Sequence, residues 1–236
     1  MIRGIIDFHS HILPDIDDGS RSVEESIKLL QMESKQGISH VIATPHFYPQ
    51  HDNPESFLRR RRNAEMILRE AMAEYENMPQ LDVGAEVYYF TGISDSHVLS
   101  QLTIAGRNSI LIEMPGAKWT DAMYRDLEGI YTKQGLIPIV AHVERYLTIW
   151  NSESVCKRLA ELPVLVQSNA SFFQHRSTVS KALKMLKKDR IHLLGSDCHN
   201  LIDRKPNLGE TVELIGEELG NECLRRVISY QQMALE

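Results

Sequence analysis

The sequence contains few cysteines and no long apolar run, and both absences limit where the protein can work. Its 236 residues include only three cysteines, Cys156, Cys198 and Cys223, which cannot all pair with one another. No stretch approaches the roughly 20 consecutive apolar residues that a membrane-spanning helix needs. The N-terminal segment reaches Asp7 too early to be a secretory signal peptide. We therefore expect a reduced, cytoplasmic protein without a disulfide framework or a membrane span.

Positively charged residues are also fewer than negatively charged ones. The 26 lysines and arginines are outnumbered by 32 aspartates and glutamates, which gives a formal net charge of −6. This balance argues against a general nucleic-acid-binding protein, which usually carries a basic surface. Apolar residues make up 42% of the chain and charged residues 25%, values typical of a folded soluble protein. The sequence also lacks linkers, repeats and low-complexity tracts, so we expect a single domain over residues 1–236.

Short apolar segments alternate with helical patterns along the chain. The apolar segments are bounded by turn or polar residues, as strands buried in a parallel sheet tend to be. Helical patterns separate them, from one that begins at the capping box Ser22–Glu25 to a last one at Glu210–Leu219. Seven segments are candidate strands: Arg3–Phe8, His40–Ala43, Asp82–Ala85, Ser109–Ile112, Ile137–Ala141, Val164–Gln167 and Ile191–Gly195.

This alternation predicts a parallel sheet covered by helices, either an open doubly wound sheet or a closed barrel. No G-x-G-x-x-G motif follows the first strand, which argues against a dinucleotide-binding open sheet. Polar residues follow nearly every candidate strand, and the carboxyl ends of barrel strands converge on active sites. This placement favours a barrel.

Five of the ten histidines and three acidic residues fall at these strand ends. His9 and His11 are two residues apart, so in an extended chain both side chains face the same side. Asp197 and His199 form another pair with this spacing. The complete set of strand-end residues is His9, His11, His46, Glu86, Glu113, His142, Asp197 and His199.

Imidazole and carboxylate groups together are typical of zinc, manganese or iron sites. Eight or nine such groups are too many for one tetrahedral ion, so we expect two or three ions that share carboxylate bridges. Each residue taken alone has a simpler interpretation. A lone histidine at a strand end is usually a polar residue whose hydrogen bonds are satisfied within the protein. Glu86 alone could cap a helix or pair with an arginine. Histidine or acidic residues at the ends of six candidate strands, however, favour a metal centre.

An acidic segment follows the first histidine pair. Asp15, Asp17, Asp18 and Gly19 could form an ordinary turn, because aspartate and glycine favour turns. Alternatively, one of these carboxylates reaches back to a metal ion. The spacing alone favours neither interpretation.

These motifs resemble the polymerase and histidinol phosphatase (PHP) superfamily, and most closely the bacterial tyrosine-protein phosphatases of capsular and exopolysaccharide synthesis. The resemblance covers residues 5 to about 204. It implies an α/β fold, a PHP-type distorted (β/α)7 TIM-like barrel. The matching segments are His9–Pro14 with Asp17–Gly19, Ala43–His46, Gly84–Glu86, Leu111–Glu113, Ala141–Tyr146 and Ser196–Asn200.

The resemblance also implies up to three metal positions, with manganese as the first choice and iron, zinc or magnesium as alternatives. The implied ligands are His9, His11, Glu86 and Asp197 for the first ion, Glu86, Glu113 and His142 for the second, and Asp18, His46 and His199 for the third. Asp17 is adjacent to Asp18 and also acidic, so the choice between them stays open. The sixth strand ends in Ser168 and Asn169, without a ligand, as the resemblance implies.

Arg145 and Arg204 fall on the family's phosphate-binding positions, although either could instead form a surface ion pair. Cys198 and Arg204 also have the C-x5-R spacing of cysteine-dependent tyrosine phosphatases. The intervening loop has no glycine to let backbone N–H groups converge on phosphate, and Asp203 would repel it. Cys198 lies between two ligands on one face, so its side chain should point away from the metals.

Other features have simpler interpretations. The basic run Arg59–Arg62 is a solvated helix face, or a patch that attracts an acidic or phosphorylated peptide. Trp119 and Trp150 either pack in the core or line a mouth that receives a phosphotyrosine ring. The aromatic run Tyr88–Phe90 has no assigned role.

The function that fits best is a metal-dependent phosphatase acting on the phosphotyrosine-bearing tail of a bacterial tyrosine kinase. The first alternative is a small-molecule phosphatase of the same superfamily, such as a histidinol phosphatase. The second is a PHP domain without catalysis that serves as a binding module, although the complete ligand set argues against it.

Overall fold

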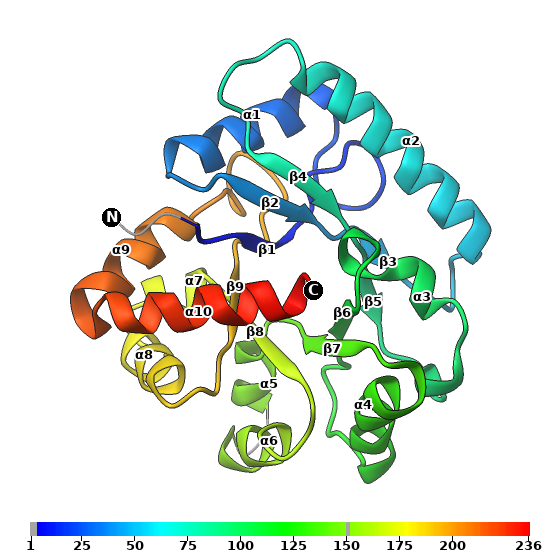
Figure 1. Cartoon of the computed structure of the whole chain (residues 1–236), viewed down its shortest axis with the longest axis vertical. Helices are drawn as coiled ribbons and strands as arrows, with labels where there is room; N and C mark the ends of the chain where they lie inside the picture. Colours follow the sequence, from blue (N-terminus) through cyan, green and yellow to red (C-terminus); the bar gives the residue numbers. More distant parts are fainter. Residues whose placement is uncertain (1–3, 150–151) are drawn as a thin grey trace.

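The computed structural model describes residues 4–149 and 152–236, and in these residues nine parallel strands curl into a barrel surrounded by helices (Figure 1). The strands occupy seven positions around the barrel, because two positions are split into successive short strands. The strands are β1 (Asp7–Ser10), β2 (His40–Ala43), β3 (His46–Phe47), β4 (Gln80–Val83), β5 (Glu86–Tyr88), β6 (Ser109–Glu113), β7 (Ile137–Val140), β8 (Leu165–Asn169) and β9 (Leu193–Gly195).

The two split positions lie side by side. Pro45 separates β2 from β3, since proline has no N–H to donate to a neighbouring strand. Gly84 and Ala85 separate β4 from β5, and the Gly84 and Glu86 amides still donate to the carbonyls of Ala43 and Pro45. The interruption therefore bends both strands together and carries the second halves, β3 and β5, into a six-stranded sheet with β6 to β9.

The barrel closes where the first strand meets the segment after the last one. The Asp197 amide donates to the His9 carbonyl at 2.7 Å, and the His11 amide donates to the Cys198 carbonyl at 2.8 Å. The contact needs a glycine at position 195, because a Cβ atom there would lie 2.6 Å from the Cβ of His9. Closure thus places the His9–His11 and Asp197–His199 pairs next to each other.

Helices cover the outside of the barrel, and their ends follow local capping rules. Ser22 accepts a hydrogen bond from the Glu25 amide at the start of α1, and Asn53 does the same for the Ser56 amide before α2. Gly135 ends α4 in the left-handed region, at φ 69°. The helices are α1 (Val23–Lys35), α2 (Pro54–Met72), α3 (Leu99–Leu102), α4 (Asp121–Gln134), α5 (Glu144–Ile149), α6 (Ser152–Leu159), α7 (Ser171–Gln174), α8 (Val179–Lys187), α9 (Leu208–Leu219) and α10 (Asn221–Ala234), with short 3-10 turns at Ile93–Asp95 and Ile104–Gly106.

The helix α10 closes the amino end of the barrel, across which it lies in Figure 1. The hydroxyl of Ser109, at the start of β6, donates to the Ala234 carbonyl at 2.6 Å, and Gln231 donates to the Ile6 carbonyl. Ala234 packs with the apolar residues that fill the barrel interior, which are Phe8, Ile42, Ile104, Leu111, Ile139, Ala141, Leu165 and Leu193. The opposite, carboxyl end is left for polar side chains.

The expected fold is confirmed, with corrections at the level of single elements. The first strand is Asp7–Ser10, so residues 4–6 of the predicted segment Arg3–Phe8 precede it and Arg3 lies outside the described residues. The predicted segment Asp82–Ala85 spans the end of β4 and the break before β5. The helix α10 was not predicted, although its buried positions recur with a helical period. Trp119 is buried, whereas Trp150 lies outside the described residues. Among the described residues, no helix has both the length and the apolar character that crossing a membrane requires.

Candidate metal centre

The structure brings all eleven of the predicted site residues together at the carboxyl end of the barrel. Each has a nitrogen or oxygen atom within 3.6 Å of another member of the group. They come from separate strand positions, because parallel strands end at the same rim. The residues are His9, His11, Asp18, His46, Glu86, Glu113, His142, Arg145, Asp197, His199 and Arg204.

The first group joins the H-x-H motif to two carboxylates. His9 Nε2 lies 3.1 Å from His11 Nε2 and 3.1 Å from Glu86 Oε2. His11 Nε2 is 3.3 Å from the same Glu86 oxygen, and Asp197 Oδ1 is 3.5 Å from both imidazole nitrogens. Ligand atoms that bind one ion tetrahedrally at about 2.0–2.2 Å are roughly 3.3–3.6 Å apart. The atoms of His9, His11 and Glu86 lie close enough to one another to share one ion, and Asp197 Oδ1 borders this group on the side of the two imidazoles.

Glu86 also faces a second group through its other oxygen. Its Oε1 lies 2.7 Å from His142 Nε2, which is 3.6 Å from Glu113 Oε1. Burial and the negative charge of Glu86 raise the pKa of Glu113 to about 7. One buried carboxylate therefore contacts both groups, as a bridging ligand does.

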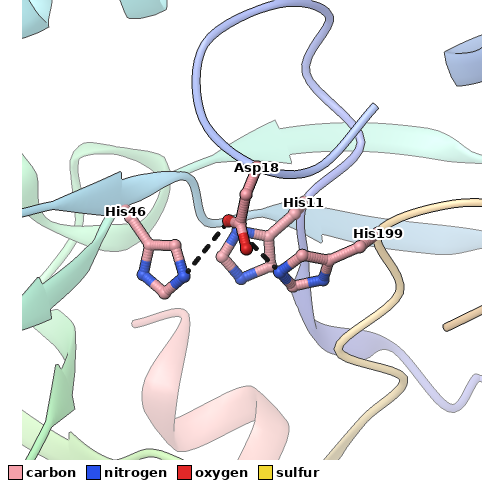
Figure 2. A group of neighbouring side chains, drawn as sticks. All are labelled: His11, Asp18, His46 and His199. Carbon is pink, nitrogen blue, oxygen red and sulfur yellow. Dashed lines mark ion pairs between the residues drawn. The ribbon is translucent and has the colours of Figure 1, made fainter. Parts of the chain in front are cut away.

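A third group lies on the solvent side of the first, and Figure 2 shows it. Asp18 lies in the loop after β1, and its Oδ1 is 3.6 Å from both His46 Nε2 and His199 Nε2. The ring of His11 lies beside that of His199, with centroids 3.9 Å apart. His46 Nδ1 also lies 3.1 Å from Glu86 Oε2 and 3.9 Å from Glu113 Oε2, so His46, Glu86 and Glu113 form a further group that could hold an ion.

The two adjacent aspartates have different surroundings. Asp17 accepts hydrogen bonds from His11 Nδ1 at 2.7 Å and from the backbone amides of Gly19 and His46. Burial alone would raise the pKa of Asp17, but these donors hold it below its usual range. Asp18 is 67% exposed and faces only the third group. The geometry therefore makes Asp17 the residue that orients His11 and leaves Asp18 facing the cluster.

The donor atoms themselves fit divalent cations. Among the described residues, His46 Nδ1, Glu86 Oε2 and His199 Nε2 are buried without a hydrogen-bond partner. An unsatisfied buried polar atom costs about 1–3 kcal/mol. Burial lowers the pKa of His46, and it lowers that of His199 to about 3, so both rings are neutral. Neutral imidazole is the form in which a histidine side chain binds a metal ion.

Two members of the cluster have a strained backbone. His142 has φ 32° and Asp197 has φ 54°, a region that residues other than glycine rarely adopt. Each such residue costs about 1–3 kcal/mol, and such residues concentrate at functional sites. The His142 amide donates to Gln167 Oε1 at 2.6 Å and the Asp197 amide to the His9 carbonyl, so both conformations are held by specific bonds.

The strand β8 contributes no member of the cluster, but its amides orient the others. Gln167 Oε1 lies 3.3 Å from His9 Nδ1, and Gln167 donates to Asn169, which in turn donates to Asp197 Oδ2 at 2.8 Å. Partners of this kind fix the tautomer and orientation of metal ligands. Sequence reasoning missed them, although polar residues inside a buried strand were the available signal. Glu144 accepts a hydrogen bond from the hydroxyl of Ser168, which lies between Gln167 and Asn169 on β8. Burial raises the pKa of Glu144 to about 7.

Both predicted arginines reach the cluster from outside. Arg145 lies 2.6 Å from Asp197 Oδ2 and 3.2 Å from His142 Nε2, and Arg204 lies 2.8 Å from Asp197 Oδ1. Their side chains are 43% and 38% exposed, so they face solvent as well as the site. Cys198 instead points to the opposite side, where it is buried with Asp7 and Glu33. The arginines, but not the thiol, can therefore meet a ligand from solvent.

Comparison with known proteins agrees with this geometry. The family model described as capsular polysaccharide synthesis, CpsB/CapC, matches residues 5–235. The tyrosine-protein phosphatase CpsB of Streptococcus agalactiae serotype III is 29% identical over 229 residues, which cover 92% of each chain. The tyrosine-protein phosphatase YwqE of Bacillus subtilis is 28% identical over 233 residues, covering 92% of this chain and 86% of YwqE.

A solved structure gives the same relationship. It comes from crystal structures of YwqE from Bacillus subtilis and CpsB from Streptococcus pneumoniae, described as unique metal-dependent tyrosine phosphatases. It matches with a TM-score of 0.82 at 25% identity, and covers 93% of this chain and 89% of the other. The expected family and its class of enzyme, metal-dependent phosphatases, are thereby confirmed. The chain belongs to the CpsB/CapC family of capsular polysaccharide synthesis proteins.

Proposed function

We propose that this protein is a manganese-dependent protein-tyrosine phosphatase that acts on the phosphotyrosine-bearing tail of a bacterial tyrosine kinase controlling capsular or exopolysaccharide synthesis. The observation that carries the proposal is one contiguous cluster of histidine and carboxylate side chains that could bind metal ions, with two arginines in contact with its member Asp197. The tyrosine-protein phosphatases among the relatives support the substrate. The three unpaired cysteines support a cytoplasmic location.

We further propose that the three groups of side chains hold up to three ions. Ion-pair distances of 2.7–3.6 Å within the groups support this division. The proposed ligands are His9, His11, Glu86 and Asp197 for the first ion, Glu86, Glu113 and His142 for the second, and Asp18, His46 and His199 for the third. When bound, such ions lower the pKa of water to supply a nucleophile and neutralise charge on the phosphate.

The residues around the ligands have separate tasks in this proposal. Asp17 and Gln167 hold the rings of His11 and His9 in the orientation that presents Nε2 to the cluster. Arg145 and Arg204 bind the phosphate oxygens, since a guanidinium group can bond two oxygens at once. A tyrosyl leaving group has a pKa near 10. It needs less proton donation than an alkyl alcohol, so the proposal requires no dedicated general acid.

A comparison of substrates tests this proposal against its alternatives. Turnover should be measured on a phosphotyrosine peptide, a phosphoserine peptide of the same sequence and histidinol phosphate, with metal analysis of the same sample. We expect the phosphotyrosine peptide to have the highest kcat/KM. A preference for histidinol phosphate would favour the small-molecule alternative. No turnover of any substrate by metal-loaded protein would favour a binding module.

A second test separates metal-dependent from cysteine-dependent chemistry. Chelation should abolish turnover, and Mn²⁺ should restore it. Cys198→Ser should keep most of the activity, because the thiol is fully buried and burial raises its pKa well above the usual value. Complete loss of activity in this variant, with its metal content intact, would overturn the metal-dependent mechanism.

A further inference from the structure

The register of two short strands places a pair of tyrosines directly above the metal-type ligands. In β3 and β5, His46 lies opposite Glu86. Tyr48 and Tyr88 follow two residues later, on the same face as these ligands, because side chains alternate along extended chain. Phe47, between them in sequence, instead packs in the apolar layer beneath the helices. The two tyrosines thus form the next layer outward, toward the mouth of the barrel.

The rings of this pair are in contact with each other and with the site. The centroids of Tyr48 and Tyr88 are 5.8 Å apart, and Tyr48 stacks on His46 at 4.9 Å with an interplanar angle of 29°. Both tyrosines are partly exposed. The neighbouring Tyr89 differs, since it is buried and its hydroxyl donates to Asp126 at 2.7 Å. Tyr48 and Tyr88 therefore offer ring surface to the mouth, whereas Tyr89 is part of the core.

Two arginines also reach the mouth, and one of them lies 3.6 Å from Glu113, which borders Tyr88. Arg145 and Arg204, which follow β7 and β9, meet there on Asp197. Tyr88 pairs in register with Glu113 on β6, so the aromatic side borders the second group of ligands. The arginines and the tyrosines therefore border the same cluster, so a phosphate ester bound there lies within reach of both.

There is room for a ring beside Tyr48. A cavity of about 440 Å³ opens next to Tyr48, and its lining includes Asp18, His46, His51 and Arg60. It reaches the third group of ligands directly, through Asp18 and His46. An aryl group that lies against Tyr48 is thus adjacent to the site rather than buried in it.

We propose that Tyr48 and Tyr88 form the subsite for the aryl ring of the substrate and that this pair determines the preference for phosphotyrosine over phosphoserine. The inference rests on the proposed phosphatase function and deepens it. Aromatic rings in offset or edge contact are favoured beyond the area that they bury. The shorter alkyl chain of phosphoserine has no ring to place there, so only the aryl ester gains from the contact.

The test combines Tyr48→Leu, Tyr88→Leu and the double variant with Tyr131→Leu as a control, since Tyr131 is 46% exposed on α4. For metal-loaded protein, kcat/KM should be measured on phosphotyrosine and phosphoserine peptides of one sequence. Dissociation constants for phenylphosphonate and methylphosphonate give a readout without turnover. Each leucine variant at positions 48 and 88 should weaken the aryl ligand and substrate about 2- to 10-fold. The alkyl values should stay within about twofold.

Tyr48→Phe and Tyr88→Phe should keep the preference, because they retain the ring. Unchanged aryl-to-alkyl ratios in Tyr88→Leu and in the double variant would overturn the inference, as would an equal loss for both ligands. If Tyr48→Leu loses metal, the Tyr88→Leu variant decides the outcome, through the ratio of its dissociation constants for phenylphosphonate and methylphosphonate. Wild-type protein that does not prefer phosphotyrosine would contradict the proposed function itself, which is a separate result.

Discussion

The two ends of the barrel are built from the same strands but have opposite character. At the amino end, Phe8, Leu111 and Leu193 fill the interior beneath α10 and are fully buried. At the carboxyl end, His9 and Glu113, only one or two residues further along the same strands, belong to the charged cluster. A single short strand therefore serves both packing and chemistry. This division predicts that substitutions at the two ends have separable effects on stability and on activity.

Loss of a proposed metal ligand at the carboxyl end should have the largest effect on activity. We expect Glu113→Ala and His142→Ala to lose metal and turnover together. The loss should exceed the roughly 10- to 100-fold that follows when a residue that only orients a ligand is removed. The chain should stay folded, because both side chains lie at the rim, outside the apolar interior. Metal analysis, kcat/KM and circular dichroism on the same samples check this, and normal metal stoichiometry in both variants would contradict it.

The arginines at this end should affect turnover without affecting metal content. Arg145→Ala and Arg204→Ala should keep full metal content while kcat/KM falls about 10²- to 10³-fold, as for other donors to a charged transition state. Lysine at either position should rescue only in part, because it retains the charge but cannot bond two oxygens in a fork. Near wild-type kcat/KM in both alanine variants would show that the ligand cluster alone binds the phosphate.

The amino end should show the reverse pattern. Leu165, at the start of β8, is 5% exposed in the barrel interior, and Leu165→Ala should lower the free energy of unfolding by about 2–5 kcal/mol. Metal content and kcat/KM should be unchanged well below the melting temperature. Urea denaturation measures the effect, with Met66→Ala on the exposed face of α2 as the matched control. A metal defect in Leu165→Ala would break the proposed separation of the two ends.

The smallest expected effect concerns a buried acid that belongs to neither end. Burial and the neighbouring Asp7 raise the pKa of Glu33 well above its ordinary value of 4.5, so the folded protein keeps a proton there that the unfolded chain releases. Above about pH 4.5 the folded state therefore binds more protons, and the free energy of unfolding falls as pH rises toward the folded pKa. The contribution of Glu33 to the free energy of unfolding changes by at most about 1.4 kcal/mol per pH unit.

Glu33→Gln should remove this dependence. Its stability relative to wild type should rise from pH 5 to pH 8, and its metal stoichiometry should be unchanged. Chemical denaturation at several pH values, with metal analysis at each, checks both expectations. A loss of metal in Glu33→Gln would mean that the group formed by Asp7, Glu33 and Cys198 belongs to the metal centre after all.

The strand-end residues could be predicted from sequence because their pattern is local. His9 and His11 share a face through simple alternation, and parallel strands must end at one rim. The orienting residues could not be predicted in this way. Gln167 contacts His9 across 158 positions, and this contact exists only once the barrel has closed. The different tasks of Asp17 and Asp18 likewise depend on how one loop folds back over His46, which spacing does not encode.

Closure of the barrel has a consequence for biosynthesis. The first strand can pair with the segment around Cys198 only after nearly 200 residues have left the ribosome, because Ser10 and Cys198 form the bridge between them. The interior stays uncovered still longer, until Ala234 and the rest of α10 are made. Contacts of such high sequence separation form slowly and leave apolar surface exposed in the meantime. The nascent chain should therefore depend on chaperones until its C-terminal helix docks.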